Sequence, residues 1–325
     1  MFGNTLYVEK IQHALEQSNF PATPDNLYDP VRYMLSLSGK RIRPLLVLLG
    51  ADLFNIENID DALPASLAIE YFHNFSLVHD DIMDNAPLRR GKEAVHKKWN
   101  ESVAILSGDA LLVKAYEQLA FVKVEYIPEL LRIFSQLAIE VCEGQQYDMD
   151  FESIDSITGD QYIEMIRLKT SVLLGGALEM GAIIANATLV DRKHINNFGV
   201  NLGIAFQLQD DILDVYGDPS TFGKQIAGDI IANKKTILYI LLKSKLEQED
   251  TQEFEDLLTN KAITSDEKIT RMKNLYQKYH VVQEAGELKG KYTHLAYESL
   301  QKVNVTEPQK KELYSLADNL MRRTQ

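Results

Sequence analysis

The sequence predicts an all-α fold. Gly and Pro are sparse, at 17 and 9 of 325 residues, and alternation of apolar and polar residues is nearly absent. Apolar residues recur instead at spacings of three and four, the period of one helix face. We expect helices near residues 3–18, 25–37, 41–54, 60–83, 101–121, 127–150, 159–185, 189–216, 234–246, 249–259, 265–279, 281–301 and 307–323. Because no Gly- and Ser-rich linker or repeat separates them, we expect a single domain over residues 1–325.

Composition excludes several classes of protein. Hydrophobic residues make up 45% of the chain, enough for a large core, yet no run of about 18 apolar residues occurs. The first residues lack a basic region followed by an apolar one, so we expect neither a membrane span nor a secretory signal. Cys142 is the only cysteine, which excludes an internal disulfide and favours the cytoplasm. A net charge of −13 argues against a nucleic-acid partner.

An aspartate cluster follows the most informative of the expected helices. Asp80 and Asp84 are four residues apart, so they project from one helix face about one turn apart, and Asp81 lies beside them. Three neighbouring carboxylates repel one another unless a hard cation lies between them. Mg²⁺ is the best candidate, because it takes one or two carboxylates and completes its shell with water and phosphate.

A second aspartate cluster repeats this spacing. Asp210, Asp211 and Asp214 again follow an apolar helical run. A single cluster of this kind is often a solvated helix face. Two clusters, each behind a helix apolar enough to be buried, instead predict a binding site for Mg²⁺ and a phosphate ligand.

Basic residues accompany the clusters. Lys40, Arg41 and Arg43 lie in a Gly- and Pro-bounded segment that suits an anion, and Arg89, Arg90 and Lys92 follow the first cluster. Taken alone, the first segment could equally be a solvated helix terminus. Lys169 and Thr170 lie within the most apolar helix, where a buried lysine needs an anion, either a ligand or Asp148. Residues 223–236, which include Lys224 and Lys234, are predicted to be a mobile loop that covers phosphates.

Together these segments resemble the trans-isoprenyl diphosphate synthases, the polyprenyl synthetase family, over essentially the whole chain. The matching segments occur in the family's order: Gly-Lys-Arg-Ile-Arg-Pro at 39–44, His73, Asp-Asp-Ile-Met-Asp at 80–84, Arg89-Arg90-Gly91, Gly-Gln at 144–145 with Asp148, Lys169-Thr170, Phe-Gln-Leu-Gln-Asp-Asp-Ile-Leu-Asp at 206–214, Gly223-Lys224 and Asn233-Lys234. The resemblance implies an all-α bundle around a deep central cavity of the isoprenoid synthase type.

The resemblance also implies roles for the site residues. Asp80, Asp84 and Asp210 would hold three Mg²⁺ on the diphosphate of an allylic substrate, with Asp81, Asp211 and Asp214 as further ligands or behind them. The same diphosphate would be neutralised by Arg89, Lys169, Lys224 and Lys234. The second substrate, isopentenyl diphosphate, would be bound by Lys40, Arg43, His73 and Arg90. Thr170 and Gln207 would line the place where positive charge develops, and the family is commonly homodimeric.

The implied reaction needs no side-chain nucleophile. Cations stabilise the departing pyrophosphate as the allylic C–O bond breaks, the double bond of isopentenyl diphosphate attacks the carbocation, and a proton is lost. Water must be excluded because it would quench the cation.

The helix before Asp80 also predicts a short product. Each extended five-carbon unit is about 5 Å long, close to one helical turn. Phe75 lies five residues before Asp80, with Phe72 three residues earlier and the small Ser76 beside it. Family members that make long products usually have a small residue in place of Phe75, and bacterial farnesyl synthases usually carry an insertion that this chain lacks. The resemblance therefore favours geranylgeranyl diphosphate over farnesyl diphosphate.

Two other readings remain at this stage. A terpene cyclase or head-to-head coupling enzyme also uses Asp-rich helices, but it needs no second diphosphate pocket of the Lys40, Arg43, His73 and Arg90 type. A non-catalytic regulatory subunit of a heteromeric synthase can lose one Asp cluster, whereas both are intact here.

Overall fold

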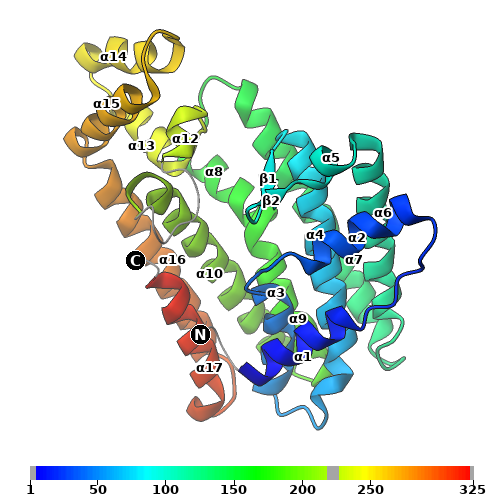
Figure 1. The fold of residues 1–325 in the computed structure, drawn as a ribbon. Coiled ribbons are helices and arrows are strands. Elements are labelled where there is room, and N and C mark those ends of the chain that lie inside the picture. Colours follow the sequence, from blue (N-terminus) through cyan, green and yellow to red (C-terminus); the bar gives the residue numbers. More distant parts are fainter. Residues whose placement is uncertain (1–4, 218–226, 323–325) are drawn as a thin grey trace. The chain divides into compact units, whose positions relative to one another are not determined.

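The computed structural model describes residues 5–217 and 227–322, which form two compact units. Unit 1 comprises Met1–Ile139, Leu173–Asn197 and Leu300–Leu316, and unit 2 comprises Glu140–Val172, Phe198–Ser299 and Ala317–Gln325. Nearly all of the regular structure is helical, as expected (Figure 1). No described helix combines the length and apolar character that a bilayer crossing requires. The proposal of one domain over residues 1–325 stays a prediction.

Unit 1 is built around helix α4. Its elements include α1 (Thr5–Glu16), α2 (Asp25–Ser36), α3 (Ile42–Leu53), the 3₁₀ turn η1 (Ile59–Ala62), α4 (Leu63–Met83), α5 (Val95–Lys98) and α6 (Glu101–Leu119). Residues 65–72 of α4 are all buried, because the helix contacts α6, α3, α2 and α1. An apolar surface on every side suits such a central helix. Its burial fixes the helix that ends in the first aspartate cluster.

A β-hairpin follows α4, in a stretch between two expected helices for which the sequence predicted no regular element. Strands β1 (Leu88–Arg89) and β2 (Lys92–Glu93) pair antiparallel through the two-residue turn Arg90-Gly91. Both turn residues have positive φ, 52° and 74°, which is the backbone geometry that matches the twist of a tight hairpin. The hairpin turns Arg89 back toward the end of α4.

The remaining helices belong wholly or partly to unit 2. They are α7 (Ile127–Ser153), α8 (Gly159–Ile166), the π-helical turn η2 (Arg167–Ser171), α9 (Val172–Ile184), α10 (Leu189–Tyr216), α12 (Gly228–Ile231), α13 (Ile237–Lys245), α14 (Gln248–Thr259), α15 (Ser265–Lys278), α16 (Val281–Gln301) and α17 (Glu307–Met321). Of these, α7, α9, α10, α16 and α17 contribute residues to both units, and Val172 is the one residue of α9 that belongs to unit 2. The core of unit 2 joins side chains of α8, α10, α13, α14, α15 and α16.

One expectation for this part of the chain was wrong. Residues 228–231 of the predicted loop 223–236 form helix α12, and the helix expected near 234–246 is present as α13, Ile237–Lys245. The reason is that Asp214 accepts a hydrogen bond from the Asp229 N–H at 3.0 Å, while Ala227, in a left-handed conformation, donates its N–H to the Asp214 carbonyl. These bonds satisfy the start of a short helix. Lys224 lies outside the described residues.

Candidate active site

The first aspartate cluster lies at the C-terminal end of α4 in unit 1. Asp80 and Asp81 belong to the last turn of the helix, and Asp84 is its C-cap residue. Their exposure differs, because Asp81 is buried, Asp80 is half-buried and Asp84 is exposed. The two aspartates that share a helix face are therefore the accessible ones.

Arg89 of the hairpin neutralises the buried member of this cluster. Its Nε donates to both carboxylate oxygens of Asp81, at 2.9 and 3.1 Å, and its Nη2 donates to Asp80 Oδ2 at 3.3 Å. Burial raises the pKa of Asp81, and the bound Arg89 opposes that rise. Such forked contacts fix the orientation of a carboxylate as well as compensating its charge.

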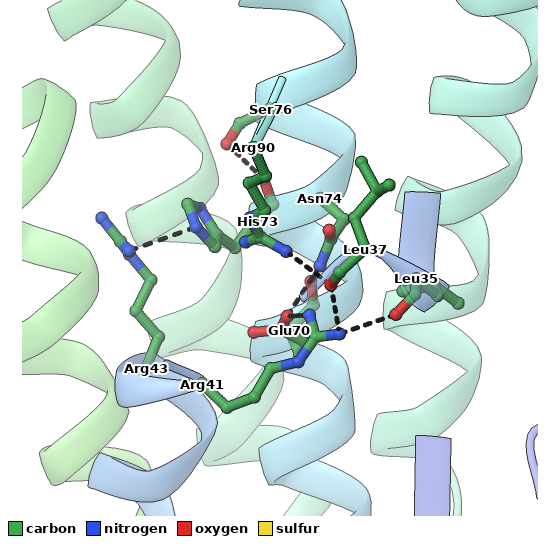
Figure 2. Close-up of polar contacts among 9 residues, drawn as sticks. All are labelled: Leu35, Leu37, Arg41, Arg43, Glu70, His73, Asn74, Ser76 and Arg90. Carbon is green, nitrogen blue, oxygen red and sulfur yellow. Dashed lines mark hydrogen bonds and ion pairs between the residues drawn. The ribbon is translucent and has the colours of Figure 1, made fainter. Parts of the chain in front are cut away.

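A basic cluster, made of Arg43, His73 and Arg90, lies along the same helix in unit 1 (Figure 2). Arg43 Nη1 lies 3.1 Å from His73 Nε2, and Arg90 Nη1 donates to the Leu37 carbonyl at 3.2 Å. Burial and then Arg43, together with Arg90, Arg89 and Arg41, hold the pKa of His73 well below its usual value. A neutral His73 accepts the Arg43 hydrogen bond at Nε2, which leaves Nδ1–H as a donor. Lys40, at the edge of this loop, is exposed.

The second aspartate cluster lies near the end of α10 in unit 2. Asp211 is buried and accepts hydrogen bonds from the Tyr162 hydroxyl, from Gln207 Nε2 at 3.2 Å and from the Ile237 N–H at 3.3 Å. Burial, and to a lesser extent nearby Asp229, raises the pKa of Asp211 to about 7. Asp214 is also buried, whereas Asp210 is half-buried. In this cluster Asp210 alone stays accessible, whereas the first cluster keeps two accessible aspartates.

Lys169 and Thr170 lie in the π-helical turn η2 of unit 2. Gly144 permits this turn to approach α7, because a Cβ at Gly144 would lie 2.2 Å from the Lys169 backbone nitrogen. Lys169 Nζ donates to Asp148 Oδ2 at 2.5 Å, the pairing that the sequence offered as one alternative. Thr170 is half-buried. Single-turn π-helices often occur at functional sites, where they redirect side chains.

An aromatic chain of contacts runs behind Phe75 in unit 1. Ring centroids lie 5.6 Å apart for Phe75 and Phe72, 5.5 Å for Phe72 and Phe134, and 4.9 Å for Phe134 and Tyr116. Phe72 and Phe134 are each 1% exposed, while Phe75 is half-buried and Ser76 stands beside it. The two phenylalanines expected to limit product length are therefore in contact with one another.

The structure brings the predicted residues into two groups. Unit 1 gathers the first cluster with Arg89, and Arg43 with His73 and Arg90. In unit 2, Asp211 is bonded by Gln207, and Lys169 by Asp148. Lys234 lies on an exposed segment after α12. The predicted roles of these residues stay predictions.

Three residues that hold these groups in place were missed or given another task by sequence reasoning. Tyr162 and Glu70 were not singled out, and Arg41 was expected to face an anionic ligand together with its neighbours. Tyr162 binds Asp211, and no feature of its sequence neighbourhood distinguishes it from a core tyrosine. Arg41 forms a buried ion pair with Glu70. Glu70 could have been found, because it is the single acidic residue in the apolar stretch 63–78 and a buried carboxylate requires a partner.

The donors of both clusters suit Mg²⁺. Within residues 5–217 and 227–322, no group of three or more His, Cys, Asp or Glu side chains converges as a complete set of metal ligands. Mg²⁺ does not require one, because it is bound through one or two carboxylates together with substrate phosphates and water. The accessible carboxylates fit an ion that arrives with a phosphate ligand.

The chain is similar to several proteins of known sequence or structure. The family model "Polyprenyl synthetase" matches residues 24–278. A geranylgeranyl pyrophosphate synthase of Geoglobus acetivorans is 37% identical over 97% of this chain and 95% of its own length. A geranylfarnesyl diphosphate synthase of Aeropyrum pernix is 35% identical over 90% of this chain and 93% of its own. A crystal structure of a geranylgeranyl pyrophosphate synthase superposes with a TM-score of 0.91 at 41% identity, covering 99% of this chain and 98% of that one.

Proposed function

The chain belongs to the polyprenyl synthetase family, and from that premise we propose that it is a short-chain prenyltransferase making geranylgeranyl diphosphate from isopentenyl diphosphate and allylic diphosphates. One observation carries the proposal: the basic cluster of Arg43, His73 and Arg90 lies in the same unit as the first aspartate cluster, yet is distinct from it. A condensing enzyme needs a second place for a diphosphate, whereas a cyclase does not. Relatives named geranylgeranyl synthases support the product.

We propose that the allylic diphosphate binds with three Mg²⁺ ions at the aspartate clusters. Asp80, Asp84 and Asp210 are the accessible carboxylates and would be the ligands. Asp81, Asp211 and Asp214 are buried and bonded within the protein, so they would support the ligands from behind. When bound, Mg²⁺ supplies positive charge that stabilises the departing pyrophosphate.

The cationic side chains have complementary tasks in this proposal. Arg89, Lys169, Lys224 and Lys234 would neutralise the allylic diphosphate. Isopentenyl diphosphate would be held by Lys40, Arg43, His73 and Arg90. Thr170 and Gln207 would direct their oxygens toward the developing allylic cation, and the proton released after condensation would pass to the pyrophosphate oxygens.

Phe75, backed by Phe72, is the proposed floor for the growing chain. A half-buried ring supported by two fully buried rings resists displacement, because such packing leaves little space for the rings to move into. We prefer the C20 product; farnesyl diphosphate, one unit shorter, and geranylfarnesyl diphosphate, one unit longer, are the alternatives.

We also propose a homodimer that uses the exposed apolar side chains of α6 and the segment after it. Leu106 is 60% exposed, Val113 67% and Phe121 66%, and Ile105 and Val124 are exposed as well. An apolar surface of this kind is typical of an interface between subunits. Val113→Lys should convert the dimer to a monomer in light scattering coupled to gel filtration, whereas an unchanged mass would contradict this interface.

Product analysis tests the proposed function. The purified chain is incubated with Mg²⁺, isopentenyl diphosphate and in turn the C5, C10 and C15 allylic diphosphates, and the products are dephosphorylated and separated by length. We expect a C20 alcohol, and products of C25 or longer from Phe75→Ala. A C15 product from the unaltered chain would move the floor toward Ser76, and an unchanged length in the variant would overturn the floor. No condensation with any primer would favour the regulatory-subunit alternative.

A further inference from the structure

A buried ion pair lies next to the basic cluster of unit 1. Arg41 and Glu70 are paired with side chains 3% and 1% exposed, and Asn74 Nδ2 donates to Glu70 Oε1 at 2.9 Å (Figure 2). Glu70 lies one turn before His73 on α4. The pair therefore joins the loop before α3 to the helix that carries His73.

Arg41 also fixes the backbone of the preceding loop. Its Nη2 donates to the Leu35 carbonyl at 2.6 Å and to the Leu37 carbonyl at 3.0 Å. The same Leu37 carbonyl accepts the hydrogen bond from Arg90 Nη1. Arg41 and Arg90 of the basic cluster thus share an acceptor. Two further cations proposed to bind isopentenyl diphosphate, Lys40 and Arg43, lie within two residues of Arg41 in the sequence.

The backbone conformation of Arg41 is a second indication that its contacts hold this loop in place. Its backbone is left-handed, with φ 48° and ψ 37°, although it carries a Cβ, and it is the N-cap residue of α3 without a capping side-chain bond. A non-glycine residue keeps this conformation only where surrounding contacts hold it. The guanidinium bonds to Glu70 and the two carbonyls are those contacts.

Stability alone is a weak reason for such a pair. The desolvation of two buried charges offsets much of their attraction, and apolar replacements of similar volume often serve equally well. A forked guanidinium that reaches three acceptors instead defines a single geometry. We infer that Arg41 and Glu70 are positioning residues that preorganise the pocket of Lys40, Arg43, His73 and Arg90 for isopentenyl diphosphate. This inference rests on the function proposed above.

The double variant Arg41→Met/Glu70→Met tests the inference. It removes both buried charges together, so it leaves no unpaired ion and should fold. We expect the KM for isopentenyl diphosphate to rise about tenfold, equivalent to about 1.4 kcal/mol. The KM for the allylic substrate, and kcat at saturating isopentenyl diphosphate, should change less than about twofold. A merely structural pair would not separate the two substrates in this way.

A matched control and a binding assay complete the test. Arg192→Met/Glu129→Met removes another ion pair of unit 1, with a 2.7 Å contact between α10 and α7, and should leave both KM values unchanged. Calorimetric titration with isopentenyl diphosphate alone should show a Kd raised by the same factor in the Arg41 and Glu70 variant. This readout stands even if the unaltered chain condenses nothing, an outcome that would refute the proposed function alone.

Either kinetic or binding data can overturn the inference. An unchanged KM and Kd for isopentenyl diphosphate in the folded double variant would do so, as would an equal rise in both KM values. If the double variant does not fold, Arg41→Lys provides the second test, because it keeps the charge but loses the fork that reaches the carbonyls. It should raise the same KM, and an unaltered value would again refute the inference.

Discussion

The two aspartate clusters have the same spacing but compensate their buried carboxylates in different ways. In unit 1, Asp81 is bound by the guanidinium of Arg89. In unit 2, Asp211 is bound by neutral donors, which are a phenol, an amide and a backbone N–H. The pKa of Asp211 is raised to about 7, which reflects burial without a cation among the bonded groups.

This difference separates two roles, structural support and ligand binding, that the shared spacing of the aspartates does not distinguish. The middle aspartate of each cluster is tied down inside its unit, whereas Asp80, Asp84 and Asp210 retain exposure. A tied carboxylate fixes the end of its helix, and an accessible one can take a ligand. The comparison therefore predicts that accessible and buried aspartates will respond differently to substitution.

The largest expected effect is on catalysis through the accessible aspartates. Asp80→Asn and Asp210→Asn should each lower kcat/KM about 10³-fold, because each removes a negative charge that would hold Mg²⁺ on the substrate diphosphate. Steady-state condensation assays across a range of Mg²⁺ concentrations measure this loss. The thermal midpoint should not fall in either variant, and near-normal activity would break the assignment of these aspartates as ligands.

The second effect separates the buried middle aspartates of the two clusters, Asp81 and Asp211. Asp81→Asn should destabilise unit 1 by about 2–3 kcal/mol, because it removes the closer of the two carboxylates that the partly buried Arg89 binds and leaves only the 3.3 Å contact with Asp80. Asp211→Asn should be neutral or stabilising at pH 8, since its partners are neutral and it removes a buried charge. Urea midpoints measured with a chelator at pH 8 make the comparison. An equal loss of stability in the two variants would show that it does not matter whether a cation or neutral donors bind the buried carboxylate.

The sequence predicted most of the helices because their causes are local. The apolar period of three and four residues places α10, for example, at its observed bounds, Leu189–Tyr216. The hairpin after α4 was missed because it depends on a two-residue turn with positive φ at Arg90, an arginine that no turn rule favours. Helix α12 was missed because Asp214, fifteen residues before Asp229, supplies the bond at its start.

The candidate site divides in the same way. Spacing was enough to identify both aspartate clusters and the basic segments, because the charged residues of each lie close together in the sequence. It could not distinguish Asp81 from Asp80, since that depends on the hairpin that brings Arg89 to the end of α4. Nor could it find Tyr162, which lies 49 residues from the carboxylate that it binds.

A third and smaller effect concerns the hydrogen bond between Tyr162 and Asp211 in unit 2. Tyr162→Phe removes one donor from Asp211 and leaves Gln207 and the Ile237 N–H in place. We expect a loss of about 1.5 kcal/mol in the free energy of unfolding at pH 8, because the bond is made to a charged group. Urea unfolding measures it, with Tyr276→Phe as the control, a buried tyrosine of the same unit core. An equal loss of unfolding free energy in the control would show that the Tyr162 hydroxyl stabilises the chain no more than another buried tyrosine hydroxyl does.

The smallest effect concerns His73 of unit 1. Arginines surround this imidazole, whereas no cation binds Asp211 in unit 2. Burial and the arginines around His73 hold its pKa well below 6.5, so the unfolded chain binds this proton first as pH falls. Its contribution to stability is therefore complete above the unfolded pKa and is lost as pH falls through 6.5 toward the folded pKa. Relative to His73→Gln, which keeps an acceptor for Arg43, the natural chain should lose about 1 kcal/mol more between pH 8 and pH 5.5. Urea midpoints of both proteins at the two pH values test this. A parallel loss would mean that His73 binds its proton at the same pH in the folded and the unfolded chain, so that burial and the arginines of unit 1 do not lower its pKa.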